Sequence, residues 1–156
     1  MIVRDLMKTS PTTCTPAMNL AAVTELLWSA GCGALPVVDS GGKIVGIITD
    51  RDICVALGTR NQRPSELVAE HVMTRHVAVC EAGDEIHDAL KAMRAAKVRR
   101  LPVVNGVGSL EGILCLSDLI VHARHDGHRQ SLTYEDVMVT LKDIHSRHRA
   151  AAAAGR

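Results

Sequence analysis

The stretch GIITDRD, Gly46 to Asp52, places polar residues directly after an apolar run. Two β-branched residues follow the glycine, a pattern typical of a strand that ends where the polar residues begin. The same distance from glycine to aspartate recurs in GILCLSD, Gly112 to Asp118. The recurrence indicates that both stretches belong to a repeated unit.

A shift of 66 residues overlays the chain on itself without a gap. The matched landmarks are Met7 with Met73, Cys14 with Cys80, Leu35-Pro36-Val37-Val38 with Leu101-Pro102-Val103-Val104, Gly46 with Gly112, and Asp52 with Asp118. We therefore predict two copies of one unit, repeat 1 over residues 1–66 and repeat 2 over 67–124, with an extension over 125–156. Two copies are too few for a solenoid, so we expect them to pair about a pseudo-twofold axis.

Each copy predicts the same order of elements, a β-prone segment, a helix, two strands joined by a Gly-rich turn, and a short helix, which is an α/β (α+β) fold. The expected first helices cover residues 19–31 and 85–98. Their apolar residues recur at spacings of three and four: Leu20, Val23, Leu26 and Leu27, then Ile86, Ala89, Leu90 and Met93. Gly31 is the expected end of the first helix. Asp52 and Asp118 are expected to be the N-caps of the short helices.

Composition excludes several classes of protein. With no Phe and with Trp28 and Tyr134 as the only aromatic residues, the chain offers no platform on which nucleic-acid bases stack. A net charge of +1 supplies no strong field for nucleic acid or a membrane surface. No apolar run is long enough to span a bilayer, and the N-terminus lacks a secretory segment. We expect a cytoplasmic protein without nucleic-acid or membrane partners, whose five scattered cysteines are small buried hydrophobic residues.

The tandem order of elements, the repeated L-P-V-V strand and the glycine-to-aspartate segment resemble the CBS domain pair, or Bateman module, over residues 1–124. The resemblance implies a stand-alone regulatory sensor without catalysis, and we find no catalytic motif. It implies binding of an adenosine-containing ligand, such as AMP, ADP, ATP, S-adenosylmethionine or a dinucleotide. It also implies a homodimer and an unidentified protein that the module regulates.

The resemblance assigns the ribose hydroxyls of the ligand to Asp52 and Asp118, because a carboxylate offers two acceptors for a vicinal diol. The alternative is that each aspartate only caps its helix. Thr49 is the hydroxyl residue of the family pattern, or an ordinary strand threonine. Repeat 2 departs from the pattern with Cys115, a weak hydrogen-bonding group, and Ser117 is expected to supply the hydroxyl.

The resemblance assigns the phosphates of the ligand to Arg99 and Arg100, the alternative being solvated surface charges. Repeat 1 has glycine and alanine at those positions, and its nearest cation is Arg51. We therefore expect the Asp118 site to bind a phosphorylated ligand more tightly than the Asp52 site. An apolar slot for adenine is expected from residues of both repeats: Thr13, Cys14, Ile53, Val79, Cys80 and Leu119.

The extension predicts one helix that begins after Ser131 or Thr133. Its apolar stripe is Leu132, Val137, Met138, Leu141 and Ile144, which needs a surface to pack on. A structural interaction protein that acts through this helix, with empty clefts, is the competing function. A metal site at His122, His125 and His128 is a second alternative, although no carboxylate or cysteine completes it.

Overall fold

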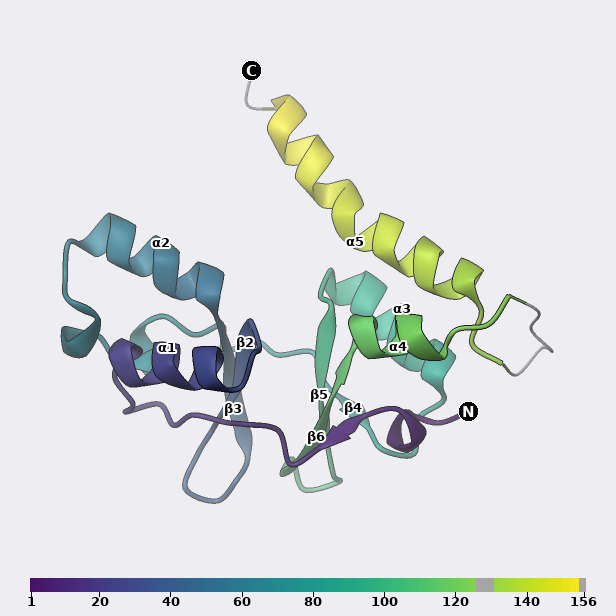
Figure 1. Cartoon of the computed structure of the whole chain (residues 1–156), viewed down its shortest axis with the longest axis horizontal. Coiled ribbons are helices and arrows are strands. Elements are labelled where there is room, and N and C mark those ends of the chain that lie inside the picture. The colour runs from purple at the N-terminus through teal and green to yellow at the C-terminus, as the bar shows by residue number, and fades with distance from the viewer. Residues whose placement is uncertain (126–130, 155–156) are drawn as a thin grey trace. The chain divides into compact units, whose positions relative to one another are not determined.

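The computed structural model describes residues 1–125 and 131–154, which form two compact units (Figure 1). The repeat-1 unit consists of Ser10–Val77 and Gly106–Leu110. The repeat-2 unit consists of Met1–Thr9, Ala78–Asn105 and Glu111–Arg156. The segment at the start of the chain therefore packs with repeat 2, and residues 68–77, which precede the helix of repeat 2, pack with repeat 1.

The repeat-1 unit has the predicted order of elements. They are α1 (Leu20–Ser29), β2 (Ala34–Val38), β3 (Ile44–Thr49) and α2 (Asp50–Arg60), followed by 3-10 turns at Pro64–Glu66 and Ala69–His71. Strands β2 and β3 are antiparallel, with Leu35 opposite Ile48. The β-prone segment before α1 contributes a parallel bridge from Cys14 to Val37.

The repeat-2 unit repeats this order and adds a strand and a helix. Its elements are a 3-10 turn (Val3–Asp5), β1 (Lys8–Thr9), β4 (Cys80–Glu81), α3 (Ile86–Ala96), β5 (Arg100–Val104), β6 (Leu110–Cys115), α4 (Leu116–His122) and α5 (Tyr134–Ala154). The sheet order is β1-β6-β5-β4, with β1 antiparallel to β6 and β4 parallel to β5. Strand β1, which comes first in the sequence, thus lies at the edge of a sheet built from repeat 2.

Two matched glycines, Gly112 in β6 and Gly46 in β3, allow the segments at the start of the repeats to pack closely against these strands. A Cβ atom on Gly112 would lie 2.8 Å from the backbone oxygen of Lys8, and one on Gly46 would lie 2.5 Å from Met73 Sδ. Real Cβ atoms do not tolerate such distances. The repeated glycine is therefore explained by the packing of another segment against the strand.

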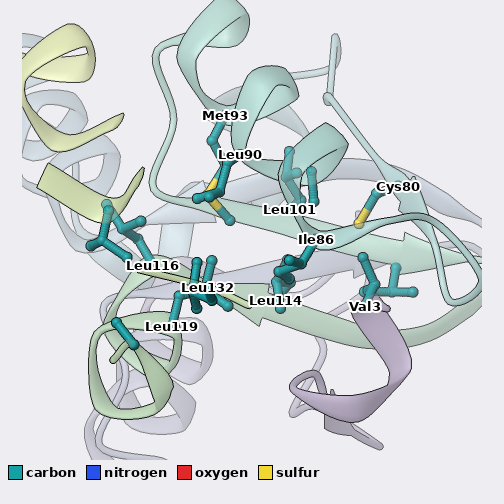
Figure 2. Packing of buried hydrophobic residues seen from close by; sticks show 14 of the residues in the cluster. Val3, Cys80, Ile86, Leu90, Met93, Leu101, Leu114, Leu116, Leu119 and Leu132 are labelled. Atoms are coloured by element: carbon teal, nitrogen blue, oxygen red, sulfur yellow. The ribbon is translucent and has the colours of Figure 1, made fainter. Parts of the chain in front are cut away.

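Each unit has its own hydrophobic core. The predicted inward positions of α3, Ile86, Ala89, Leu90 and Met93, are all buried, and Figure 2 shows three of them packed with residues of the sheet. In α1, Leu20, Val23 and Leu27 are buried and Leu26 is partly buried. These buried faces confirm the helical periodicity.

Helix α5 packs on α3 and α4 of the repeat-2 unit (Figure 1). Leu132, just before the helix, is buried, and so are Val137 and Ile144 within it. Lys97 Nζ donates to the backbone oxygen of Asp143 at 2.7 Å. The prediction for Met138 was wrong: its side chain is 52% exposed, because it lies about 100° around the helix from the buried Val137.

The helix ends correct another prediction. Thr49 and Cys115 occupy the N-cap positions of α2 and α4, so Asp52 and Asp118 are not N-caps but the third residues of their helices. The expected end of α1 is confirmed, since α1 stops at Ser29 and Gly31 adopts a left-handed φ of 58°. No described helix is both long and apolar enough to cross a membrane.

Candidate functional site

The carboxylate of Asp52 helps to cap the start of helix α2. Its Oδ2 accepts two hydrogen bonds from Thr49, from the backbone nitrogen at 2.9 Å and from Oγ1 at 2.7 Å. In return, Thr49 Oγ1 accepts from the backbone nitrogen of Asp52 at 3.2 Å. The two residues form a reciprocal capping box at the start of α2.

The matched carboxylate of Asp118 has different hydrogen-bond partners. Its Oδ2 is buried and makes no hydrogen bond among the described residues. Its Oδ1 lies 3.6 Å from Lys8 Nζ, an ion pair rather than a close hydrogen bond. A buried carboxylate oxygen without a donor costs about 1–3 kcal/mol, so a ligand hydroxyl that reached and donated to this oxygen would remove that cost.

The residue at the N-cap explains one of the two missing donors, the side-chain hydroxyl. Cys115 makes no side-chain capping hydrogen bond at α4, whereas Thr49 caps α2. A thiol is a weak donor and acceptor, so it cannot replace the threonine hydroxyl. Burial raises the pKa of the Cys115 thiol and the Asp118 carboxylate adds to the rise, while Arg100 and Lys8 oppose it. The thiol therefore stays protonated and neutral beside Asp118.

A third Thr-x-x-Asp pair occurs at the start of α5. Asp136 Oδ2 accepts from the backbone nitrogen of Thr133 at 3.0 Å and from its Oγ1 at 2.6 Å, the arrangement seen at Thr49 and Asp52. Burial raises the pKa of Asp136, but the hydrogen bonds from Thr133 and the nearby His87 outweigh it and leave the pKa below its ordinary value. The threonine–aspartate pattern therefore also caps a helix that lies outside the two repeats.

A small pocket of about 150 Å³ lies at the start of α4. Its lining consists of Arg99, Arg100, Cys115, Leu116, Ser117, Ile120 and Leu141. The structure thus brings together four of the predicted site residues, the two arginines, Cys115 and Ser117. Asp118 follows Ser117 in α4 but is not part of the lining. The pocket is smaller than the roughly 300–1,000 Å³ of a complete ligand site, so it suits one end of a ligand, and its cations favour an anionic end.

A larger pocket of about 610 Å³ lies in the repeat-1 unit, between α1 and α2. It is lined by Thr24, Leu27, Trp28, Gly31, Cys32, Gly33, Asp50 and Ile53. Of the predicted site residues only Ile53 borders it, and Thr49 and Asp52 do not. Arg51, the expected cation of repeat 1, is exposed on α2 and is not part of the lining. We therefore do not assign the larger pocket to the predicted ribose site.

The residues expected to hold adenine are mostly in the cores. Cys14 and Ile53 belong to the core of the repeat-1 unit, and Cys80 and Leu119 to that of the repeat-2 unit. Val79 is exposed and Thr13 is partly exposed. Side chains buried in this way can support a slot from behind but present little surface to a base.

Of the five cysteines expected to be buried, Cys14 and Cys80 are, Cys32 and Cys115 are partly buried, and the prediction is wrong for Cys54, which is exposed on α2. Burial raises the pKa of the Cys14 thiol to about 11. Burial and, secondarily, the Asp84 carboxylate raise the pKa of the Cys80 thiol to about 12. Both thiols are therefore protonated at neutral pH, as small hydrophobic residues are.

The histidines of the alternative metal site are His122, His125 and His128. Among the described residues, no group of three or more His, Cys, Asp or Glu is arranged to hold a metal ion. His122 Nδ1 lies 2.8 Å from the backbone oxygen of Asp118, and His128 lies outside the described residues.

Sequence reasoning missed Lys8. The residue is 69% exposed on β1 and reaches Asp118, which is 20% exposed. The available signal was the 66-residue offset of Met7 and Met73, which shows that the segment before each repeat is part of the pattern. That offset does not say which repeat the segment packs on.

Known proteins resemble this chain over both repeats. The family model for the CBS domain matches residues 3–59 and 68–125. The CBS domain-containing protein YhcV of Bacillus subtilis is 32% identical over 77% of this chain and 84% of its own length. Inosine-5'-monophosphate dehydrogenase of Mycobacterium bovis is 35% identical over 76% of this chain, which spans only 22% of that enzyme.

Solved structures are similar as well. The CBS domain pair of protein MJ0100, in complex with 5-methylthioadenosine and S-adenosyl-L-methionine, has a TM-score of 0.69, 27% identity and coverage of 76% of this chain and 92% of its own. CBSX2 in complex with AMP has a TM-score of 0.68, 26% identity and coverage of 77% and 93%. Hypoxic Response Protein I, solved with two coordinated zinc ions, has a TM-score of 0.72, 26% identity and coverage of 80% and 100%.

Proposed function

The chain belongs to the CBS domain family as a tandem pair of such domains, and from this premise we propose that it is a regulatory module that binds an adenosine-containing ligand at Asp118. The observation that carries the proposal is the buried Asp118 Oδ2 without a donor, beside a pocket lined by Arg99 and Arg100. A ribose hydroxyl supplies the missing donor, and a phosphate suits the arginines.

The two repeats have unequal roles in this proposal. Asp52 Oδ2 already accepts two hydrogen bonds from Thr49, and the matched positions of Arg99 and Arg100 hold Gly33 and Ala34. Repeat 1 therefore supplies the weaker site. The complexes of MJ0100 with 5-methylthioadenosine and S-adenosyl-L-methionine, and of CBSX2 with AMP, support an adenosine-containing ligand.

The module carries out no chemistry of its own in this proposal. The ligand acts by binding one arrangement of the module, or of a regulated partner, more tightly than another, because equal affinity for both shifts nothing. Protonated, buried thiols at Cys14 and Cys80 are poor nucleophiles, which agrees with a binding role.

Binding is tested first by thermal shift with AMP, ADP, ATP, adenosine and S-adenosylmethionine. A ligand at 100 times its dissociation constant adds roughly 2.7 kcal/mol to the free energy of unfolding. Calorimetry then compares the wild type with Asp118→Ala and Asp52→Ala. Loss of a charged acceptor should weaken binding by about 1.5–3 kcal/mol, roughly 10- to 150-fold, in Asp118→Ala only.

The outcomes separate the hypotheses. Equal losses from both substitutions would mean two equivalent sites and would overturn the unequal roles. No response to any of the five compounds would favour the interaction protein, which acts through α5 with its clefts empty.

We also propose a homodimer formed through the helical face of the repeat-1 unit. Trp28 is 86% exposed there and borders the 610 Å³ pocket between α1 and α2. The matched face of the repeat-2 unit, on α3 and α4, is covered by the chain's own α5. A second copy of the chain is the occupant that would bury this face, since a large apolar side chain so exposed is a mark of an interface.

Sedimentation tests the dimer. Trp28→Glu should shift the chain to a monomer by placing a charge in the interface, whereas Val121→Glu, at an apolar residue 80% exposed on α4, should not. A wild-type monomer at micromolar concentration would end this part of the proposal without affecting ligand binding.

A further inference from the structure

Lys8 supplies a cation to a site built by the other repeat. Strand β1 pairs with β6 so that Lys8 lies opposite Ile113, and α4 begins after β6 ends at Cys115. From this position Lys8 Nζ reaches to 3.6 Å from Asp118 Oδ1. The segment exchange therefore gives the Asp118 site a charge that repeat 2 itself does not encode.

Repeat 1 has no counterpart to this cation. The 66-residue offset places Thr74 in the position of Lys8, and Thr74 exchanges backbone hydrogen bonds with Ile47 at 2.9 and 3.0 Å. Within the described residues, no ion pair involves Asp52. Lys8 and Thr74 thus pair with their strands through the same antiparallel backbone pairing, but only Lys8 brings a charge to the aspartate of the unit.

We propose that Lys8 is a specificity residue of the Asp118 site, which selects anionic over neutral adenosine ligands and holds the carboxylate when the ligand is absent. The inference rests on the proposed function and names the ligand class, a phosphorylated adenosine. When the ligand binds, the ribose hydroxyls donate to Asp118 in place of Lys8. The Lys8 ammonium then binds the phosphate together with Arg99 and Arg100.

The geometry makes Lys8 suitable for this exchange. The ammonium is held by one long contact and its side chain is mostly exposed, so the ion pair is weak and easily replaced. Arg99, Arg100 and Ser117 line the pocket at the start of α4, the helix that carries Asp118. A lysine on a flexible stem can move between carboxylate and phosphate, whereas the threonine at position 74 carries no charge.

The test compares AMP with adenosine by calorimetry on the full chain. Lys8→Thr, which installs the residue of the other repeat, should weaken AMP binding by about tenfold and change adenosine binding by less than threefold. Lys8→Arg should keep the preference for AMP because the charge is retained. Lys43→Thr is the matched control, since it removes an exposed lysine from a hairpin of the repeat-1 unit.

The outcomes separate the role of Lys8 from the proposed function. An unchanged ratio of AMP to adenosine affinity in Lys8→Thr, or an equal loss in Lys43→Thr, overturns the role of Lys8. If Asp118→Ala still weakens AMP binding by about tenfold or more in that case, the proposed function stands. Failure of the wild type to bind AMP, or binding that Asp118→Ala does not weaken, overturns the proposed function and the inference with it.

Discussion

The starts of α2 and α4 occupy the same place in two copies of one unit, yet their aspartates differ in use. Asp52 is bound by the hydroxyl and the amide of Thr49, while Asp118 follows Cys115 and keeps a buried oxygen without a donor. A sulfur in place of an oxygen at the N-cap removes the hydroxyl donor, and Asp118 Oδ2 is left without a hydrogen bond. The comparison teaches that a matched residue need not have a matched function, because its neighbours decide which of its atoms are occupied.

The largest expected effect concerns Gly112 and Gly46, against which β1 and residues 68–77 pack. Gly112→Ala would place a Cβ 2.8 Å from a backbone oxygen, which cannot move without shifting β1, so we expect a loss of about 3 kcal/mol in the free energy of unfolding. In Gly46→Ala the new Cβ would lie 2.5 Å from the Met73 side chain, which can rotate, and 3.1 Å from the Thr74 backbone oxygen, so about 1 kcal/mol is expected. Urea unfolding measures both. Equal losses would show that the two contacts are equally rigid.

The next effect tests the cap of repeat 1. Thr49→Cys should destabilise the protein by about 2 kcal/mol, because it removes the N-cap and leaves Asp52 Oδ2 with one donor fewer. Thr59→Cys is the control within α2, where the hydroxyl only bonds the Val55 carbonyl, and should cost less than about 0.5 kcal/mol. Urea unfolding of both variants measures the difference. A cost in Thr49→Cys no larger than in the control would contradict the capping role.

The matched buried cysteines predict a loss of stability in alkali. The pKa of Cys14 is about 11 and that of Cys80 about 12 in the folded chain, against 9.0 for an exposed thiol, so the folded state holds protons that the unfolded state releases. Their contribution is complete below pH 9 and falls by about 1.4 kcal/mol per pH unit per thiol above it, up to about pH 11 for Cys14 and pH 12 for Cys80.

Urea unfolding between pH 8 and pH 10.5 measures this slope. Replacing either cysteine by alanine should reduce the slope by the same amount over that range, even though each replacement lowers stability at pH 8. An unchanged slope in either variant would show that the thiol is not protected from ionisation by its burial.

The smallest expected effect is that of the reverse substitution in repeat 2, cysteine to threonine at the N-cap. Cys115→Thr should give Asp118 Oδ2 the donor it lacks and raise the free energy of unfolding by about 1 kcal/mol. The same substitution should weaken AMP binding severalfold, because the ribose then competes with the threonine hydroxyl. Thermal unfolding and calorimetry on one preparation measure both quantities. Tighter AMP binding with the threonine would indicate that the hydroxyl helps hold the ligand instead.

Most of the fold was predictable because the signals are local. The periodic apolar residues of α1 and α3, the L-P-V-V strands and the Gly-rich turns each act over a few residues, and the repeat doubles every signal. The error at Asp52 and Asp118 was also local, since an aspartate is favourable both at the N-cap and in the first turn. The presence of Thr49 three residues earlier was the pattern that identifies a capping box.

Only part of the candidate site was predictable. Arg99, Arg100, Cys115 and Ser117 were named from the sequence and line one pocket, because they flank adjacent ends of β5 and β6. The place of Lys8 was not, because a two-residue strand has no periodicity to reveal its partner. The outward position of Met138 likewise depended on which face of α5 meets α3 and α4.

The sequence by itself determined the duplication, the order of elements in each copy and the helix faces that become buried, since spacing along the chain encodes them. Tertiary structure decided that β1 and residues 68–77 exchange between the repeats, that α5 covers the repeat-2 unit, and that Asp118 Oδ2 is left without a donor. These outcomes depend on contacts between residues far apart in the chain, where packing and the competition for hydrogen-bond partners determine which contacts form.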